Sequence, residues 1–177
     1  DGQLVPAYHY KITYSSNINT GVAKVKLTAT EVKYVSVCST TFLILPKKET
    51  LKGSVSSYNS AHLSWDKQGS ATGYTIMYST DKTFNTAFKY KYITKPETTN
   101  TTIKNLKYNT KYYFKIRAYK TNVGYGKWSK TVKIKTKKNP APATVKIKSA
   151  KKYSKTSIYV KWKAQTARGK SGYYVQY

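Results

Sequence analysis

The sequence contains few of the residues with which enzymes and metal sites do their chemistry. Its 177 residues include one cysteine (Cys38), two histidines (His9 and His62) and six acidic residues. One cysteine excludes a disulfide bond within the chain, and so few scattered ligands do not make the clusters that zinc or calcium requires. We therefore expect no metal site and no cofactor.

Long hydrophobic runs are also missing. The longest apolar run, Phe42–Leu45, is only as long as a strand, whereas a helix that crosses a membrane needs about 20 apolar residues. We expect no membrane span. No signal peptide opens the chain, and Asp1-Gly2 is an unusual native start. Both ends are therefore expected to be cut from a longer protein.

Acidic residues are so scarce that the formal net charge is +27, from 33 basic and 6 acidic residues. Such an excess suggests a polyanionic partner. However, only Arg117 and Arg168 are arginines, and arginine is the preferred residue for bidentate recognition of phosphate. The lysines alternate with apolar residues, as in Val132–Lys135. We therefore predict a solvated surface, no nucleic-acid partner, and an anionic cell-wall polymer as a polyanion that the charge could attract.

What the sequence does contain is aromatic residues in alternating patterns. Aromatic residues make up 15% of the chain, and 19 of them are tyrosines. Apolar and polar residues alternate in Lys24–Thr28, Lys89–Ile93 and Tyr112–Tyr119, and turn residues such as Gln68-Gly69-Ser70 separate these runs. No stretch keeps a helical period. This pattern predicts an all-β fold of tandem antiparallel β-sandwich modules.

Two proline-containing linkers divide the chain. Pro46-Lys47-Lys48 follows one apolar strand, and Asn139–Ala143 follows another. The predicted pieces are 1–46, 47–137 and 138–177. The second and third resemble each other, since Leu63-Ser64-Trp65 is echoed by Val160-Lys161-Trp162, and Gly73–Tyr78 by Gly172–Tyr177. The third piece stops about halfway through this shared pattern.

Residues 47–137 combine Trp65, the pair Leu106 and Tyr112, and the string Gly126-Lys127-Trp128-Ser129. With these residues the segment resembles one complete fibronectin type III domain of the immunoglobulin-like class. Trp65 stands where that family keeps a buried tryptophan, and the string at 126–129 matches its turn into the last strand. Leu106 and Tyr112 match a leucine and a tyrosine six residues apart, and in related sandwiches this tyrosine bonds to upstream backbone. Further inward positions of the family correspond here to Tyr74, Ile76, Tyr78, Phe114, Ile116 and Ala118.

The resemblance extends to the flanking pieces. Tyr10–Val25 and Thr41–Lys48 are similar to the C-terminal part of a short immunoglobulin-like β repeat that often precedes such modules, although Glu31–Val37 departs from its glycine-rich turn. Residues 138–177 resemble a proline-rich linker and the N-terminal half of a second fibronectin type III domain. Lys- and Tyr-rich modules of this kind are similar to those in cell-surface proteins of Gram-positive bacteria. The resemblance implies a secreted or cell-wall-attached, extracellular protein.

No catalytic constellation is predicted, so we expect no enzyme. Hydrolysis of glycosides needs two carboxylates within about 5–10 Å, and the pattern brings no such pair together. Asp66 and Asp81 are typical turn or surface residues. His62 is next to an inward leucine and should point outward, which leaves it without the partners of a catalytic triad.

A binding surface is therefore sought among exposed aromatic and basic residues. Alternation sends Tyr113, Lys115, Arg117 and Tyr119 to the outside of one strand, and Thr75 and Met77 to the outside of another. Tyrosine and arginine are enriched at binding hot spots. The same residues also stabilise sheets through cross-strand pairs without any ligand. Tyr90 and Tyr92 lie on a predicted edge strand, and Tyr125 lies at a predicted loop tip. The candidate partner-binding residues are Met77, Tyr90, Tyr92, Tyr113, Arg117, Tyr119 and Tyr125.

Three functions stay open at this point. The first is a binding module that engages a host protein or glycan. Some bacterial surface proteins with similar modules bind immunoglobulin variable regions as superantigens, so the resemblance implies immunoglobulin as a candidate. The second is a passive spacer, and the third is an accessory module of a secreted glycoside hydrolase or peptidase. The aromatic and basic residues on the outward positions favour the first, because a face of only threonine and lysine would be sufficient for a spacer.

Overall fold

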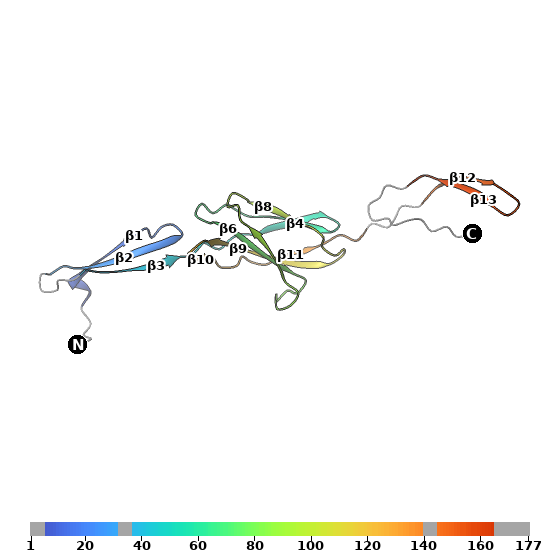
Figure 1. Cartoon of the computed structure of the whole chain (residues 1–177). Coiled ribbons are helices and arrows are strands. Elements are labelled where there is room, and N and C mark those ends of the chain that lie inside the picture. The colour runs from blue at the N-terminus through green and yellow to red at the C-terminus, as the bar shows by residue number, and fades with distance from the viewer. Residues whose placement is uncertain (1–5, 32–36, 140–144, 165–177) are drawn as a thin grey trace. The chain divides into compact units, whose positions relative to one another are not determined.

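The computed structural model describes residues 6–31, 37–139 and 145–164 (Figure 1). The chain divides into two compact units, Asp1–Lys138 and Asn139–Tyr177. All strand pairs are antiparallel. Among the described residues the one helical element is the three-residue 3-10 turn η1 (Ala7–His9). The predicted all-β class is confirmed.

The first strands form a three-stranded sheet in the order β1-β2-β3, from β1 (Tyr10–Ser15), β2 (Gly21–Ala29) and β3 (Val37–Ile44). Ala23 is the one buried hydrophobic residue among the described residues of this sheet, and Val22 and Leu43 are about half exposed. Cys38 is a free, exposed thiol on β3. The sheet therefore has little core of its own. Residues 32–36 of the unusual turn lie outside the described residues.

Two sheets then face each other as a sandwich. One has the order β4-β5-β8, from β4 (Lys52–Ser57), β5 (Ser60–Ser64) and β8 (Asn100–Ile103). The other has the order β10-β9-β6-β7, with β11 also paired to β9. Its strands are β6 (Gly73–Ser79), β7 (Lys89–Ile93), β9 (Lys111–Lys120), β10 (Gly124–Tyr125) and β11 (Val132–Lys135).

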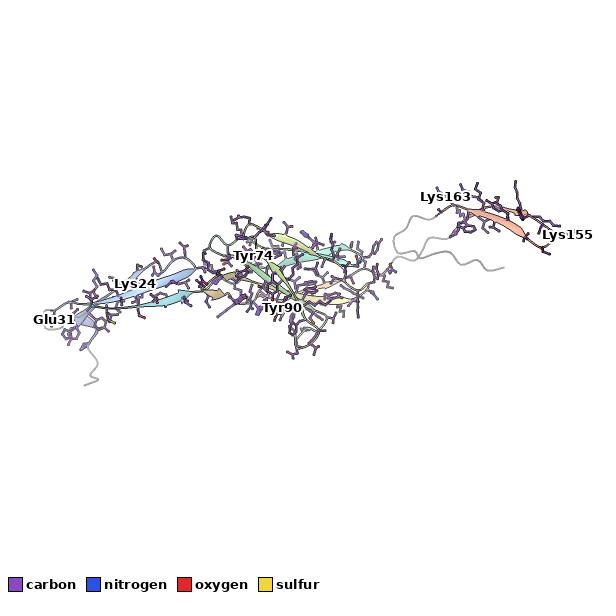
Figure 2. All side chains as sticks on the ribbon, in the orientation of Figure 1. Lys24, Glu31, Tyr74, Tyr90, Lys155 and Lys163 are labelled. Atoms are coloured by element: carbon purple, nitrogen blue, oxygen red, sulfur yellow. The ribbon has the colours of Figure 1, made fainter. Side chains whose placement is uncertain are left out.

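The core lies between these sheets and consists of the side chains that alternation sends inward. Along β9, Tyr112, Phe114, Ile116 and Ala118 are all buried, and each intervening residue is half-exposed. Opposite them on β6 lie Tyr74 and Ile76, which are fully buried; Figure 2 labels Tyr74. Burial of such side chains contributes about 1.5–3 kcal/mol each. The inward positions carried over from the family resemblance are therefore correct, with Trp65 at 4% and Leu106 at 6% exposure.

The expected tyrosine corner is present. The backbone N–H of Lys107 donates to the hydroxyl oxygen of Tyr112 at 3.1 Å. The same connection is held by Leu106, whose N–H donates to the carbonyl of Asn59 at 2.9 Å. Asn105 and Asn109 adopt positive φ values of 60° and 49°, which asparagine tolerates better than most residues. These contacts fix the end of the sandwich where β9 begins.

The second unit contains a hairpin of β12 (Ile147–Lys152) and β13 (Ile158–Trp162). Val160-Lys161-Trp162, the echo of the segment around Trp65, lies in β13. The rest of that echo, Gly172–Tyr177, and the linker residues Pro140–Ala143 lie outside the described residues. That these residues belong to a second fibronectin type III domain stays a prediction.

Candidate binding face

The solvent side of the sheet that contains β6 and β9 collects aromatic and cationic side chains, and we call it the outer face. Strand register aligns its rows: Thr75 lies between Tyr92 and Arg117, and Met77 lies between Tyr90 and Lys115. Three rings from outside β6, β7 and β9 pack onto these rows. The outer face consists of Thr75, Met77, Phe84, Tyr90, Tyr92, Tyr113, Lys115, Arg117, Tyr119, Tyr125 and Trp128.

Arg117 lies at the centre of the outer face, between two aromatic rings. Its guanidinium carbon is 4.0 Å from the ring centroid of Tyr125 and 4.3 Å from that of Trp128. A cation placed over a ring in this way contributes about 0.5–2 kcal/mol. The Nε atom of Arg117 is buried and has no hydrogen-bond partner among the described residues. The rings therefore hold Arg117 in place by packing and cation–π attraction.

The position of Trp128 is set by the residue that follows it. The N–H of Ser129 donates to the carbonyl of Ile116 at 2.8 Å, and the N–H of Ile116 donates to the Ser129 hydroxyl at 3.0 Å. Gly126 similarly donates to the carbonyl of Ala118 at 2.9 Å. These bonds tie the segment between β10 and β11 along β9, next to the two cations.

Lys115 lies two residues before Arg117, on the same face of β9, and is also covered by aromatic rings. Its Nζ atom lies 4.2 Å from the ring centroid of Phe84 and 5.1 Å from that of Trp128. Burial lowers the pKa of Lys115 below its ordinary value, and the positive charge of Arg117 lowers it further. No ion pair joins either cation to a carboxylate in the part of the chain that the structure describes.

Phe84 reaches Lys115 because Asp81 organises the loop between β6 and β7. The Asp81 carboxylate accepts bonds from the hydroxyl of Thr83 and from the backbone N–H groups of Thr83, Asn85 and Thr86, at 2.7–3.1 Å. The Thr83 side-chain bond is the largest cause that lowers the pKa of Asp81 to about 2. The loop holds Phe84 at a φ of 59°, a conformation that is strained for an aromatic residue. Asp81 is therefore a structural residue of this loop.

Met77 is not exposed, which corrects its prediction as a contact residue. Both Met77 and Thr75 point to the outer side as alternation required, but their exposed fractions are 8% and 1%. They are the central members of rows whose neighbours are long tyrosine, lysine and arginine side chains. These side chains cover the smaller central ones, so Met77 supports the surface without reaching a partner.

The edge strand β7 carries two of the three exposed rings of the outer face. Tyr90 and Tyr92 are 41% and 61% exposed, and their ring centroids are 6.0 Å apart. Phe88 continues the row, 5.6 Å from Tyr90. Figure 2 labels Tyr90 on this strand. Lys91 points to the other side, where its Nζ donates to the carbonyl of Thr102 and links the two sheets at their edge.

The other predicted tyrosines lie at the opposite side of the outer face. Tyr119 is half-buried, and its ring lies against Gly73, where an added Cβ would come within 2.8 Å of the tyrosine oxygen. Tyr125 was predicted at a loop tip, but it lies in β10, opposite Tyr119 and with its ring 5.8 Å away. Tyr113 is half-exposed and lies opposite Ser79. Only Tyr90, Tyr92 and Tyr125 of the seven candidates are largely exposed.

Sequence reasoning missed Trp128 and Phe84 as members of this surface, and it placed Lys115 on the outside of its strand without including it among the candidate partner-binding residues. Trp128 was identified only as part of a turn, and Phe84 comes from a loop without a strand pattern. A signal was present for Trp128, because a serine directly after it can bond to the strand that carries Arg117. For Phe84 no signal was present, because its placement depends on the Asp81 bonds.

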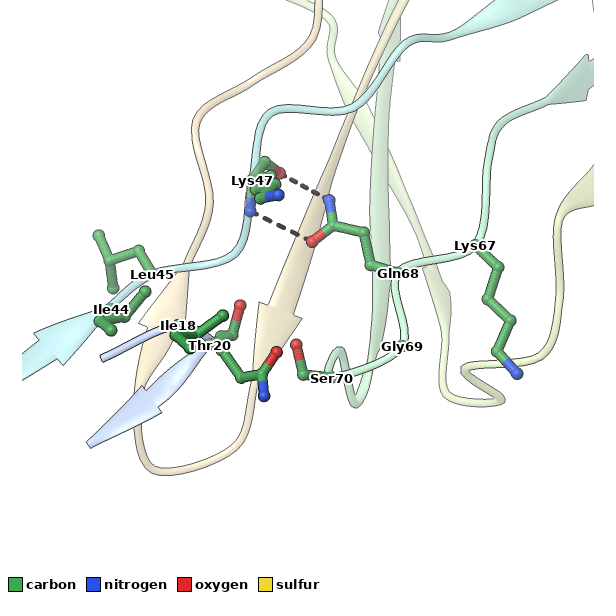
Figure 3. Close-up of a pocket in the computed structure, with 10 residues that line it drawn as sticks. Ile18, Thr20, Ile44, Leu45, Lys47, Lys67, Gln68, Gly69 and Ser70 are labelled. Atoms are coloured by element: carbon green, nitrogen blue, oxygen red, sulfur yellow. Dashed lines mark hydrogen bonds between the residues drawn. The ribbon is translucent and has the colours of Figure 1, made fainter. Parts of the chain in front are cut away.

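A second feature is a clamp at the entry to the sandwich (Figure 3). The Gln68 side chain accepts from the N–H of Lys47 at 3.2 Å and donates to the Lys47 carbonyl at 2.7 Å and to the Glu49 carboxylate. Burial raises the pKa of Glu49 to about 7, although the Gln68 bond opposes this effect. The clamp borders a cavity of about 510 Å³ that is also lined by Ile18 and Leu45. The hydrogen bonds of the clamp attach the segment before β4 to the sandwich, which is a structural role.

Neither feature contains a histidine, and the one carboxylate in them is that of Glu49. The histidines lie elsewhere: His62 is on β5, and His9 bonds to Glu31 at 2.7 Å. Within the described ranges, no three His, Cys, Asp or Glu side chains are grouped so as to hold a metal ion. Those ranges also contain no helix with the length and apolar character needed to cross a membrane. The outer face offers aromatic stacking, cations and phenol hydroxyls, which are suited to binding.

Comparison with models of known families matches residues 46–135, 90 of the 177 residues, to the fibronectin type III domain. A search of curated proteins found no match. Among solved structures, the chain is similar to the FN1–FN3 domains of chicken CNTN1, with 24% identity and a TM-score of 0.49. That alignment covers 68% of this chain but only 44% of the chicken chain.

Two single domains are similar at the same level. The FN5 domain of Drosophila Lar has 21% identity and a TM-score of 0.45, with coverage of 54% of this chain and 100% of that chain. The third fibronectin III domain of the human KIAA0343 protein has 20% identity and a TM-score of 0.45, with coverage of 56% and 90%.

Proposed function

Because the chain belongs to the fibronectin type III family, we propose that its sandwich is a non-catalytic binding module and that the outer face is its binding surface. The observation that carries this proposal is the arrangement of Arg117 and Lys115 among the rings of Phe84, Tyr125 and Trp128. Fibronectin type III domains are generally non-catalytic modules that often mediate protein binding. A surface of tyrosine, tryptophan and arginine has the composition of a hot spot.

The outer face also has the rigidity that a binding surface benefits from. Its cations are fixed by rings, and its loops are fixed by the Asp81 and Ser129 bonds. Side chains that are ordered before binding lose less conformational entropy when a partner arrives. Exposed Tyr90, Tyr92 and Tyr125 border this ordered centre and are available for contact.

For the partner we propose a host macromolecule, and we name the immunoglobulin variable region as the first candidate. Its support is the resemblance to modules of bacterial surface proteins and the aromatic-cationic character of the outer face. Fibronectin type III domains commonly occur in extracellular proteins. We accordingly propose a secreted or cell-wall-attached location on a bacterium, where the charge of +27 would also attract an anionic wall polymer.

The alternative function is a spacer, or an accessory module of a secreted glycoside hydrolase or peptidase. One observation favours a spacer: many outer-face residues, among them Arg117 and Tyr119, are half-buried and stabilise the sheet themselves. Cross-strand pairs of this kind contribute about 0.2–1 kcal/mol without any partner. The two functions differ in whether the exposed tyrosines of the outer face contact a partner molecule.

The test is a pull-down of human serum and mucosal secretions with the full chain, at physiological salt. The decisive variant is Tyr90→Ala with Tyr92→Ala, because these rings are exposed and their loss leaves the core and the Arg117 stack intact. We expect the wild-type chain to retain immunoglobulin and the double variant to lose it. Binding that appears only in a repeat at low salt, and is absent near physiological salt for the wild type and the variant alike, would reflect lysine electrostatics alone.

A matched control is Tyr58→Ala with Tyr108→Ala. These two tyrosines are 46% and 45% exposed and lie in connections away from the outer face. The control should bind as the wild type does. Equal loss of binding in both double variants, or no retained protein or glycan at micromolar concentration, would contradict the binding function and leave the spacer.

A further inference from the structure

A cavity of about 510 Å³ opens at one end of the sandwich, where β6 and β8 finish and β7 and β9 begin. Its walls come from the end of β6, the start of β7 and the connection between β8 and β9. The residues that line it include Tyr78, Ser79, Lys89, Lys104, Lys107 and Tyr112. None of its lining residues is acidic, and the cavity is separate from the clamp at Gln68.

The floor of this cavity is part of the core. Phe114 contacts two tyrosine rings. The ring of Tyr78 stacks on it with centroids 5.9 Å apart, and the centroid of the Tyr112 ring lies 6.3 Å from that of Phe114. Phe114 is fully buried, so both phenol rings are held by packing. Their hydroxyl groups are thus presented at fixed positions toward the end of the sandwich.

Both phenols can donate a hydrogen bond to a ligand. The Tyr112 oxygen already accepts from the N–H of Lys107 at 3.1 Å, which leaves its own hydrogen unused. No hydrogen bond to a described residue is among the causes that shift the pKa of the Tyr78 hydroxyl. Burial, together with the neighbouring Tyr112, raises the pKa of Tyr78 above its ordinary value, so the group stays protonated at physiological pH. Ser79 cannot add a donor, because its hydroxyl already donates to the carbonyl of Thr86.

Three cations surround these donors. Lys89, Lys104 and Lys107 are exposed, and none of them forms an ion pair within the described ranges. The nearest carboxylate in sequence, Asp81, is engaged by the hydroxyl and N–H groups of its own loop. At the clamp, by contrast, Lys67 is paired with Glu97 and the buried Glu49 lies beneath. Within the described ranges, the three lysines of the end cavity therefore have no carboxylate in an ion pair with them.

We propose that this cavity binds an oxyanion, a sulfate or phosphate group, with Tyr78 and Tyr112 as hydrogen-bond donors and Lys89, Lys104 and Lys107 as counter-charges. Charge-assisted bonds to such oxygens are about twice as strong as neutral ones. The volume suits an oxyanion together with the sugar that carries it, since ligand pockets measure about 300–1,000 Å³. The group reaches the site either as a free ion or as part of a sulfated or phosphorylated glycan.

The experiment is isothermal titration of the full chain at physiological ionic strength with sodium sulfate, sodium phosphate and a sulfated disaccharide. Lys89→Gln, Lys104→Gln and Lys107→Gln are combined in one variant. The control combines Lys48→Gln, Lys52→Gln and Lys95→Gln, which are exposed lysines at the opposite end of the sandwich. Both variants lose the same charge, so a general electrostatic effect lowers their affinities equally.

We expect saturable binding that weakens roughly tenfold or more in the first variant and by less than about twofold in the control. Saturation by the free ions identifies the ion itself as sufficient, and saturation by the disaccharide alone identifies a glycan as the source. Tyr78→Phe keeps the ring and should weaken binding about threefold to tenfold without a change in melting temperature. Equal losses in the two triple variants, or no saturable binding of any ligand, would overturn the proposal.

Discussion

The inner and outer faces of the sheet built on β6 and β9 share one backbone but are covered by different means. Inward side chains such as Ile76 and Phe114 are covered by the opposite sheet and have exposed fractions of 0%. Outward side chains have no opposite sheet, yet Thr75 and Met77 are buried as well. Their cover consists of cations and aromatic rings from β7, β9 and two connections. A sheet can therefore have two packed faces with only one hydrophobic core.

The largest expected difference between the faces concerns stability. Phe114→Ala leaves a cavity between Tyr78 and Tyr112 and should lower the free energy of unfolding by about 3–5 kcal/mol. Urea denaturation followed by tryptophan fluorescence measures this change. Tyr92→Ala on the outer face serves as control and should change it by less than about 0.5 kcal/mol. Equal losses would mean that the outer face is a second core.

Glu49, buried at the clamp that precedes β4, tests how the interior of the sandwich tolerates charge. Its pKa is raised to about 7 by burial, from an ordinary value of 4.5, so the native state holds the proton more tightly than the unfolded state. Stability from this group is therefore full below about pH 4.5 and is lost as pH rises through about 7. Glu49→Gln should be more stable than the wild type by about 2 kcal/mol at pH 8 and equal to it at pH 4. Parallel stability curves for the two proteins would contradict the burial of this charge.

Arg117 tests the cover of the outer face. Arg117→Ala removes both cation–π contacts and exposes part of Thr75, and it should cost about 1–2 kcal/mol. Arg117→Lys should recover only part of this loss, because an ammonium group lacks the planar surface that stacks between Tyr125 and Trp128. Thermal unfolding of the three proteins gives the comparison. A variant Arg117→Ala that is as stable as the wild type would show that the rings need no cation between them.

The smallest effect concerns the proton of Lys115. Burial lowers its folded-state pKa, so the native state releases this proton at lower pH than the unfolded state, and stability rises with pH through the folded pKa up to about 10.5. Arg117→Ala removes the second cause and should move the pKa of Lys115 back toward its ordinary value. NMR titration of the lysine Nζ signals measures the shift. An unchanged pKa would show that the two cations do not interact.

Much of the sandwich could be predicted, because landmarks such as Trp65 and Tyr112 and the alternation in β9 depend on local sequence pattern. For the outer face, the sequence predicted only to which side of the sheet each side chain points. Alternation showed which way Met77 points, but its burial depends on residues that are close only in the folded chain. Phe84 arrives through a loop ordered by Asp81, and Tyr125 through pairing with Tyr119. Such contacts leave no periodic signal in the sequence.

Binding at the outer face can be tested by an amide NMR titration of the full chain with an immunoglobulin variable fragment. We expect shift changes and line broadening to concentrate on the outer face, at Tyr90, Tyr92, Tyr113 and Tyr125, while the amides of β4, β5 and β8 stay unchanged. Perturbations confined to the sheet of β4, β5 and β8, or none at saturating fragment, would contradict binding at the outer face.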